Sequence, residues 1–80
     1  MEPVRRVVVY HAEGCHLCER AIEVVESARA DTAFELVLVD IGGEPDLEER
    51  YRDRIPVIEV DGEPAFTYFV TPEGLRDRLG

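Results

Sequence analysis

The order of apolar and polar positions divides this chain into segments with two different periods. The stretch from Pro3 to Tyr10 ends in a continuous apolar run, Val7-Val8-Val9-Tyr10, which is typical of a central strand covered on both faces. From Cys15 to about Arg29, apolar residues recur every three or four positions, which predicts a helix. Its core-facing stripe should consist of Cys18, Ala21, Ile22, Val25 and Ala28. The residues from 11 to 14 form the loop between the two elements.

A second strand and a second helix are expected next. Phe34 to Asp40 is again mostly apolar, and a strand that is reached through a helix is expected to lie parallel to the preceding strand. Gly42 and Gly43 end this pattern, and Pro45 suits the first turn of a helix that runs to about Asp53.

The last third of the chain predicts a hairpin followed by a helix. Pro56 to Val60 and Pro64 to Val70 are predicted strands on either side of Asp61-Gly62, which is a strong hairpin signal. Thr71 is a suitable cap for a helix that begins at Pro72. The predicted order is therefore strand, helix, strand, helix, strand, strand, helix, as in an α/β domain with a four-stranded mixed sheet.

Composition narrows the classes of protein to be considered. The chain has 80 residues, of which 45% are hydrophobic, so we expect one folded domain over residues 1–80. Eighteen acidic residues against nine basic ones disfavour nucleic acid as a partner, because such binders need clustered Lys or Arg. No apolar run reaches the roughly 18 to 20 residues of a membrane span, and no signal peptide is recognisable. The protein is expected to be soluble and cytoplasmic, with no membrane partner.

The candidate chemistry lies in the two cysteines, Cys15 and Cys18, at the start of the first predicted helix. In the first helical turn, unpaired backbone N–H groups and the helix dipole favour a negatively charged sulfur at Cys15. Cys18, one turn later, is close enough to form a disulfide with it. Two cysteines at this spacing beside a strand-helix-strand pattern predict a thioredoxin-like redox site.

A metal site is the main alternative. His11, His16 or an acidic side chain would then complete a tetrahedron around zinc with the two cysteines. A structural zinc site usually draws on a second Cys or His pair far along the chain, and this sequence has no such pair. We therefore expect redox chemistry and no bound metal.

The whole chain resembles a known fold family. The element order, with Cys15-His16-Leu17-Cys18 after the first strand and Ile55-Pro56-Val57 before the hairpin, resembles the minimal, glutaredoxin-like form of the thioredoxin fold, with helices on both faces of the sheet. Small bacterial glutaredoxin-like proteins are the most similar group. The resemblance implies that Cys15 attacks disulfides, that Cys18 resolves the mixed disulfide, and that Pro56 follows a cis peptide bond. In relatives that bond turns the backbone of the preceding residue, here Ile55, toward the substrate.

The sequence departs from the glutaredoxin pattern beside the cysteines. His16 and Leu17 replace the usual proline and tyrosine, and a protonated His16 would stabilise a thiolate. The carboxylates of Glu13 and Glu19 would oppose this effect, and Arg54 is expected to supply a compensating charge. A solvated loop histidine with no such role is the alternative for His16.

A second departure concerns glutathione. Glutaredoxins usually carry Thr-Val-Pro and, after the fourth strand, Gly-Gly with an acidic residue; this chain has Arg54-Ile55-Pro56 and Thr71-Pro72-Glu73. Pro72 has no N–H to donate, which leaves Thr71 or Glu73 to contact a ligand. Glutathione is therefore expected to be a poor ligand, and the Cys15–Cys18 disulfide the only redox group.

The predicted function is thiol–disulfide oxidoreductase. The expected partners are protein or small-molecule disulfides and a reductase of the thioredoxin or glutathione type. Two alternatives remain open. One is a module in which Cys15 and Cys18 bind a metal or share an iron–sulfur cluster across a dimer, and the other is a folded relic with an idle site.

Overall fold

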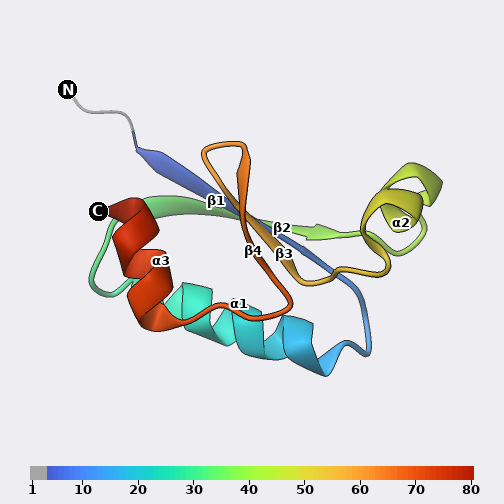
Figure 1. The fold of residues 1–80 in the computed structure, drawn as a ribbon, viewed down its shortest axis with the longest axis horizontal. Coiled ribbons are helices and arrows are strands. Elements are labelled where there is room, and N and C mark those ends of the chain that lie inside the picture. Colours follow the sequence, from blue (N-terminus) through green and yellow to red (C-terminus); the bar gives the residue numbers. More distant parts are fainter. Residues whose placement is uncertain (1–3) are drawn as a thin grey trace.

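The computed structural model describes residues 4–80, which form seven elements in the predicted order (Figure 1). The strands are β1 (Arg5–His11), β2 (Phe34–Asp40), β3 (Val57–Val60) and β4 (Glu63–Thr67). The helices are α1 (His16–Ala28), α2 (Pro45–Tyr51) and α3 (Pro72–Leu79). Pro3, the predicted start of the first strand, lies outside the described residues.

The four strands form one mixed sheet in the order β2-β1-β3-β4. β1 pairs in parallel with β2 and antiparallel with β3, and β3 pairs antiparallel with β4. Val7 of β1 lies beside Leu36 of β2 and Val60 of β3, so the continuous apolar run occupies an inner strand. The parallel pairing follows from the α1 crossover, as the pattern predicts.

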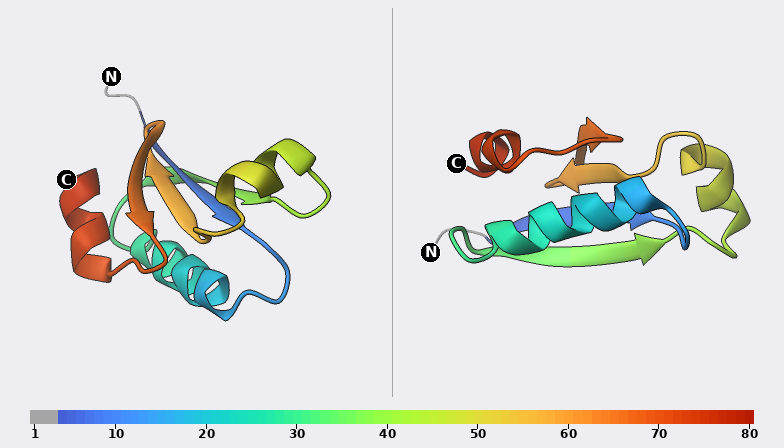
Figure 2. Two further views of the ribbon diagram at one scale, coloured as in Figure 1. Left: turned by 45° about the vertical axis from the view of Figure 1, so that its right-hand side comes forward. Right: turned by 90° about the horizontal axis from the view of Figure 1, so that it is seen from below.

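One face of the sheet forms the core with α1 and α3, which lie side by side on that face (Figure 2). Val7 and Val9 point to this face because alternate residues of a strand share a side. The predicted stripe of α1 meets them with Ala21 and Val25 buried and Ile22 and Ala28 packed at the margin. The buried cluster consists of Val7, Val9, Ala21, Val25, Phe34, Ile58, Val60, Leu75 and Leu79.

The opposite face is covered by α2 at one end. The ring of Tyr51 stacks on Tyr10 of β1 with 4.2 Å between the ring centroids, and the Tyr10 hydroxyl donates to Glu59 at 3.3 Å. Partial burial, together with Tyr51 and the carboxylate of Glu59, raises the pKa of Tyr10 to about 12. Helices therefore lie on both faces, but α2 has only seven residues and none of them is fully buried.

The Asp-Gly turn joins β3 to β4 as the sequence predicts. Both Asp61 and Gly62 have positive φ, at 53° and 84°, which is the geometry that favours Asp-Gly in a two-residue hairpin loop. The Asp61 carboxylate is also held by β1, because it accepts from the backbone N–H of Arg6 at 3.0 Å and pairs with Arg5 at 3.0 Å.

The last strand ends earlier than predicted. β4 stops at Thr67 instead of continuing to Val70, because Tyr68 takes a positive φ of 69° and the N–H of Phe69 turns back to the Thr67 carbonyl at 2.8 Å. Other boundaries differ by one or two residues: β1 continues through His11, and α2 ends at Tyr51. The early end of β4 matters for function, since it leaves three apolar residues outside the sheet.

Candidate redox site

Cys15 is the N-cap residue of α1. Its backbone is extended, with φ −93° and ψ 105°, and its sulfur accepts the backbone N–H of Cys18 at 3.1 Å. This N–H is one of those that a helix start leaves without a partner inside the helix. The sulfur thus occupies the place of the usual Ser or Asp oxygen, where N–H groups and the helix dipole favour negative charge.

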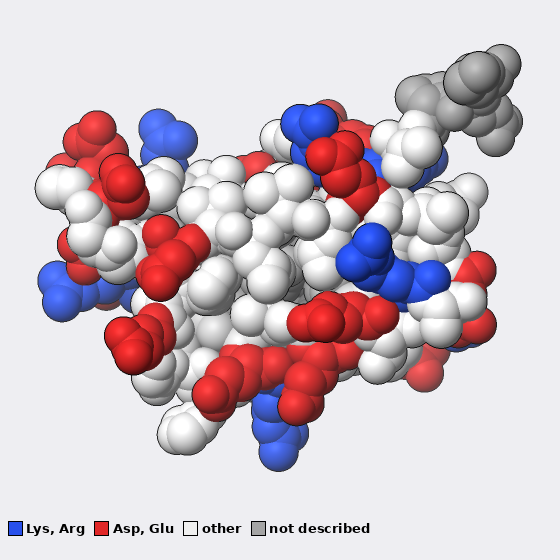
Figure 3. Space-filling view, turned by 180° about the vertical axis from the view of Figure 1, so that it is seen from behind, with Lys and Arg blue, Asp and Glu red and all other residues white. Residues whose placement is uncertain are grey.

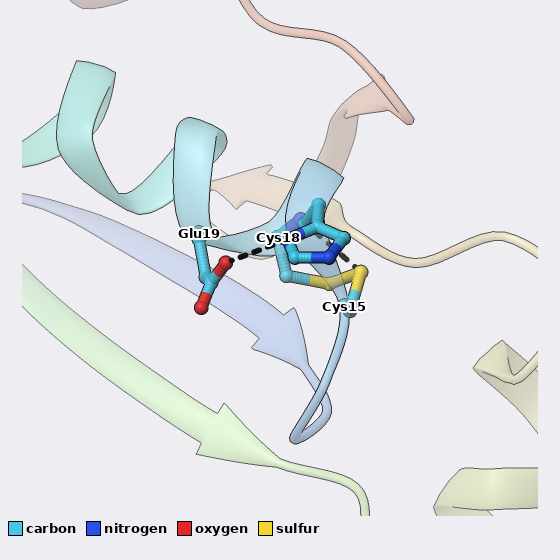
Figure 4. The surroundings of a disulfide bond; sticks show 4 residues. Cys15, Cys18 and Glu19 are labelled. Carbon is cyan, nitrogen blue, oxygen red and sulfur yellow. Dashed lines mark hydrogen bonds and ion pairs between the residues drawn. A yellow bond between two sulfur atoms is a disulfide. The ribbon is translucent and has the colours of Figure 1, made fainter.

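Cys18 differs from Cys15 in exposure. Its side chain is only 1% exposed and lies on the inner stripe of α1, whereas Cys15 is partly exposed. The two sulfurs form a disulfide across one helical turn, with 5.2 Å between the Cα atoms (Figure 4). Of the two sulfur-bearing side chains, only that of Cys15 is therefore open to solvent to any extent.

Gly14 allows the backbone to turn sharply just before Cys15. Gly14 has φ 80°, a conformation that L side chains rarely adopt, and it turns the chain from β1 into the first turn of α1. The N–H of Cys15 then donates weakly to the Ala12 carbonyl at 3.4 Å. The glycine before the first cysteine thus has a structural reason.

His16 pairs with a carboxylate. Its Nδ1 lies 3.2 Å from Glu19 Oε2, and the two side chains are 94% and 68% exposed. Glu19 is drawn beside the disulfide in Figure 4. When His16 is protonated, this exposed pair carries no net charge.

The cis-proline segment borders the cysteine loop. The Ile55–Pro56 peptide bond is cis, Pro56 is buried and Ile55 is half-buried. Within residues 4–80, neither the N–H nor the C=O of Ile55 makes a hydrogen bond. Ile55 also lines a depression of about 440 Å³ together with Ala12 and Glu13 of the loop that leads to Cys15.

The arginine that shares this depression is Arg52, not Arg54. Arg54 instead lines a separate hollow with Asp46, Glu49 and Arg50 of α2. The compensating charge expected of Arg54 stays a prediction, and Arg52 is a second candidate for that role. Both arginines follow the end of α2, so their distance from Pro56 in the sequence does not show which of them lines the depression.

Thr71 is used by the fold. Its Oγ1 caps α3 by accepting the N–H of Gly74 at 3.0 Å, as expected of a residue before Pro72. A role in substrate binding stays a prediction for this residue.

Tyr68 and Phe69, which follow β4, are 44% and 70% exposed. The sequence did not single them out as candidate site residues. The signal was present as two adjacent aromatic residues shortly before a proline, but the apolar run was assigned to the strand.

The donor set offers little support for a metal site. Within the described part of the chain, no group of three or more His, Cys, Asp or Glu side chains is arranged to hold a metal ion. Within residues 4–80, Cys15 and Cys18 thus have no third candidate ligand beside them. Of the helices in residues 4–80, none is long and apolar enough to span a bilayer.

Comparison with known proteins agrees with this geometry. The profile of the glutaredoxin-like domain family (DUF836) matches residues 6–80. The chain belongs to this glutaredoxin-like family. This chain is 28% identical over 68 residues to an uncharacterised protein of Mycobacterium tuberculosis. The match covers 79% of this chain and 70% of that protein.

Solved structures show the same fold. The solution structure of protein Ne2328 from Nitrosomonas europaea is 32% identical, with a TM-score of 0.82 over 100% of this chain and 96% of that one. A protein from X. campestris is 29% identical, with a TM-score of 0.75 over 91% and 93% of the two chains. A mutant thioredoxin from Halobacterium salinarum, 23% identical, has a TM-score of 0.64 over 94% and 71%. The glutaredoxin-like domain thus has the predicted thioredoxin fold.

Proposed function

We propose that this glutaredoxin-like protein is a dithiol–disulfide oxidoreductase in which Cys15 attacks and Cys18 resolves. The observation that carries the proposal is the asymmetry of the pair. Cys15 is accessible and accepts a helix N-terminal N–H, whereas Cys18 is buried against it. Family membership and the Cys15–Cys18 disulfide support thiol redox chemistry in general.

The reaction consists of two exchanges. The Cys15 thiolate attacks one sulfur of the substrate disulfide, so that a Cys15–substrate disulfide forms and the other substrate sulfur leaves as a thiolate that takes a proton from water. Cys18 then loses its proton to solvent and attacks Cys15, which forms the intramolecular disulfide and releases the second substrate thiol. The substrate gains two electrons, and an external dithiol or thiol reductase of the thioredoxin or glutathione type must return two electrons to the pair.

The substrate chain is proposed to pair with the backbone at Ile55. The N–H and C=O of Ile55 are unused within residues 4–80, and Ile55 borders the loop that leads to Cys15. An extended segment can add to such free backbone groups in the manner of an extra strand. This pairing requires no particular side chain, so it fits a peptide disulfide of any sequence.

Glutathione is proposed to bind this protein weakly. The segment after β4 offers Pro72 without an N–H, and Thr71 uses its hydroxyl oxygen for the cap of α3. The net charge of −9 adds a smaller, salt-screened penalty for an anionic ligand. Acidic side chains outnumber basic ones over much of the face in Figure 3. Protein disulfides in a reducing, cytoplasmic compartment are the proposed substrates.

The test is a matched pair of single-cysteine variants. After mixing with a protein disulfide such as insulin, Cys18→Ser should retain a covalent adduct on Cys15, whereas Cys15→Ser should retain none and should alkylate far more slowly. Equal trapping or equal alkylation in the two variants would overturn the assignment. Metal analysis of wild-type protein purified without oxygen tests the alternative. Stoichiometric zinc or iron that is lost in Cys15→Ser, without disulfide turnover, would favour a metal-binding module.

A further inference from the structure

A groove of about 260 Å³ lies between α1 and the chain that follows β4. One wall is a stripe of α1 that includes Leu17, Arg20 and Val24, and the other includes Tyr68 and Phe69. We call it the Leu17–Phe69 groove. Leu17 lies between the two cysteines in the sequence, so one end of the groove lies at the turn of α1 that carries Cys18.

The aromatic wall is held in place by specific contacts. The N–H of Tyr68 donates to the Pro56 carbonyl at 2.9 Å, and its hydroxyl donates to the Asp53 carbonyl at 2.5 Å. These bonds tie the segment after β4 to the cis-proline segment. They leave Phe69 70% exposed, although a phenylalanine gains stability only when it is buried. An exposed aromatic ring on a segment that hydrogen bonds hold in place is typical of a contact site for a partner.

The charge that lines the groove indicates which side chains a partner would place there. Arg20 is exposed and makes no ion pair with any side chain of residues 4–80, although the chain carries 18 acidic residues. The groove thus combines apolar walls with one unpaired guanidinium, which attracts a carboxylate. A second copy of this chain is a poor occupant, because each copy carries a net charge of −9.

We propose that the Leu17–Phe69 groove is a specificity site for protein substrates. It receives one aromatic or branched aliphatic side chain next to the attacked cysteine, while an Asp or Glu of the same substrate chain pairs with Arg20. The volume is below the roughly 300 to 1,000 Å³ of sites that enclose a whole small ligand, so one side chain is the appropriate occupant. The proposal rests on the proposed oxidoreductase function and adds a substrate class to it.

The test uses peptides whose single cysteine is joined by a disulfide to thiopyridine. The Cys15 thiolate attacks the peptide sulfur, the Cys15–peptide disulfide forms and thiopyridine leaves, so its absorbance reports one exchange. Three peptides differ only beside the cysteine: one has Phe and Asp, one has Phe and Lys, and one has Ala and Asp. The protein is the Cys18→Ser variant, which stops at this step. The Phe and Asp peptide should react about tenfold faster than either of the others.

Two substitutions and their controls locate the effect. In the same Cys18→Ser protein, Phe69→Ala should remove the preference for Phe over Ala, and Arg20→Glu should reverse the preference from Asp to Lys. The matched controls are Val4→Ala, an apolar residue that is 67% exposed but lies outside the groove, and Arg29→Glu at the far end of α1. Both controls should keep the original preferences.

The outcomes separate this proposal from the one on which it rests. Dithiodipyridine, which is neutral and carries no peptide, should react with the Cys18→Ser protein and at the same rate with its Val4→Ala and Arg29→Glu controls. If it reacts but the three peptides do not differ, the groove proposal is wrong and the redox proposal stands. If neither dithiodipyridine nor any peptide reacts, the redox proposal itself fails. A wild-type dimer that Phe69→Ala abolishes in sedimentation would place a second copy in the groove and would overturn the inference.

Discussion

The dual role of Cys15 leads to a prediction about stability that does not depend on redox chemistry. The Cys15 sulfur accepts the Cys18 N–H at 3.1 Å from an extended N-cap backbone. Replacing a capping residue by alanine costs about 0.5 to 2 kcal/mol. Under reducing conditions, Cys15→Ala should therefore be less stable than Cys15→Ser by about 1 kcal/mol, since serine supplies an oxygen for the same bond. For a domain of this size, that difference corresponds to roughly 4 to 8 °C in melting temperature.

The assay is urea denaturation of both variants in excess reductant, followed by far-UV circular dichroism. Serine is also expected to equal or exceed the reduced wild-type cysteine, because sulfur is the weaker acceptor. The slope of the unfolding free energy against urea should be the same for the two variants, which shows that only the native state has changed. Equal stability of Cys15→Ala and Cys15→Ser would show that the sulfur does not cap α1. The helix start would then have no hydrogen bond through which to stabilise a thiolate at Cys15.

Two further predictions concern the sheet face and glutathione. Because the pKa of Tyr10 is raised to about 12, its phenol favours the folded state below pH 10, and this contribution should be lost as the pH rises from about 10 through 12. Ultraviolet absorbance of the wild type should show a late tyrosine ionisation, and Tyr10→Phe should remove that late step; a late step that persists in Tyr10→Phe would contradict the assignment. Reduction of a glutathionylated peptide should be about ten- to hundredfold slower than that of a protein disulfide, the effect of one lost charge-assisted hydrogen bond of about 1.5 to 3 kcal/mol. Similar rates would show that the segment after β4 binds glutathione after all.

The features that follow from sequence are those set by local pattern. The stripe of α1 predicts that Cys18 is buried, and the accessible position of Cys15 follows from its place before that stripe. Asp61-Gly62 predicts the hairpin because its backbone preference is intrinsic. Such features depend on neighbours a few residues apart, which the sequence displays directly.

The features that sequence reasoning missed depend on contacts between distant residues. The apolar run before Pro72 has the composition of a strand, yet β4 ends at Thr67 because Tyr68 takes a positive φ of 69°, with its hydroxyl bound to the distant Asp53 carbonyl. Which of Arg52 and Arg54 lines the depression beside Glu13 likewise depends on the path of the chain after α2. No periodicity encodes either outcome.

The residues of the site fall into two groups that measurements can separate. Cys15 caps α1 and Tyr68 ties two segments together, so substitutions there change stability and activity at once. Phe69 and Arg20 are exposed; Arg20 has no ion pair within residues 4–80, and the Phe69 side chain adds little to the core. Substitutions at these two positions should leave the unfolding free energy within about 0.5 kcal/mol of wild type. A change in substrate preference without a change in stability is therefore the signature that distinguishes a recognition residue from a structural one in this protein.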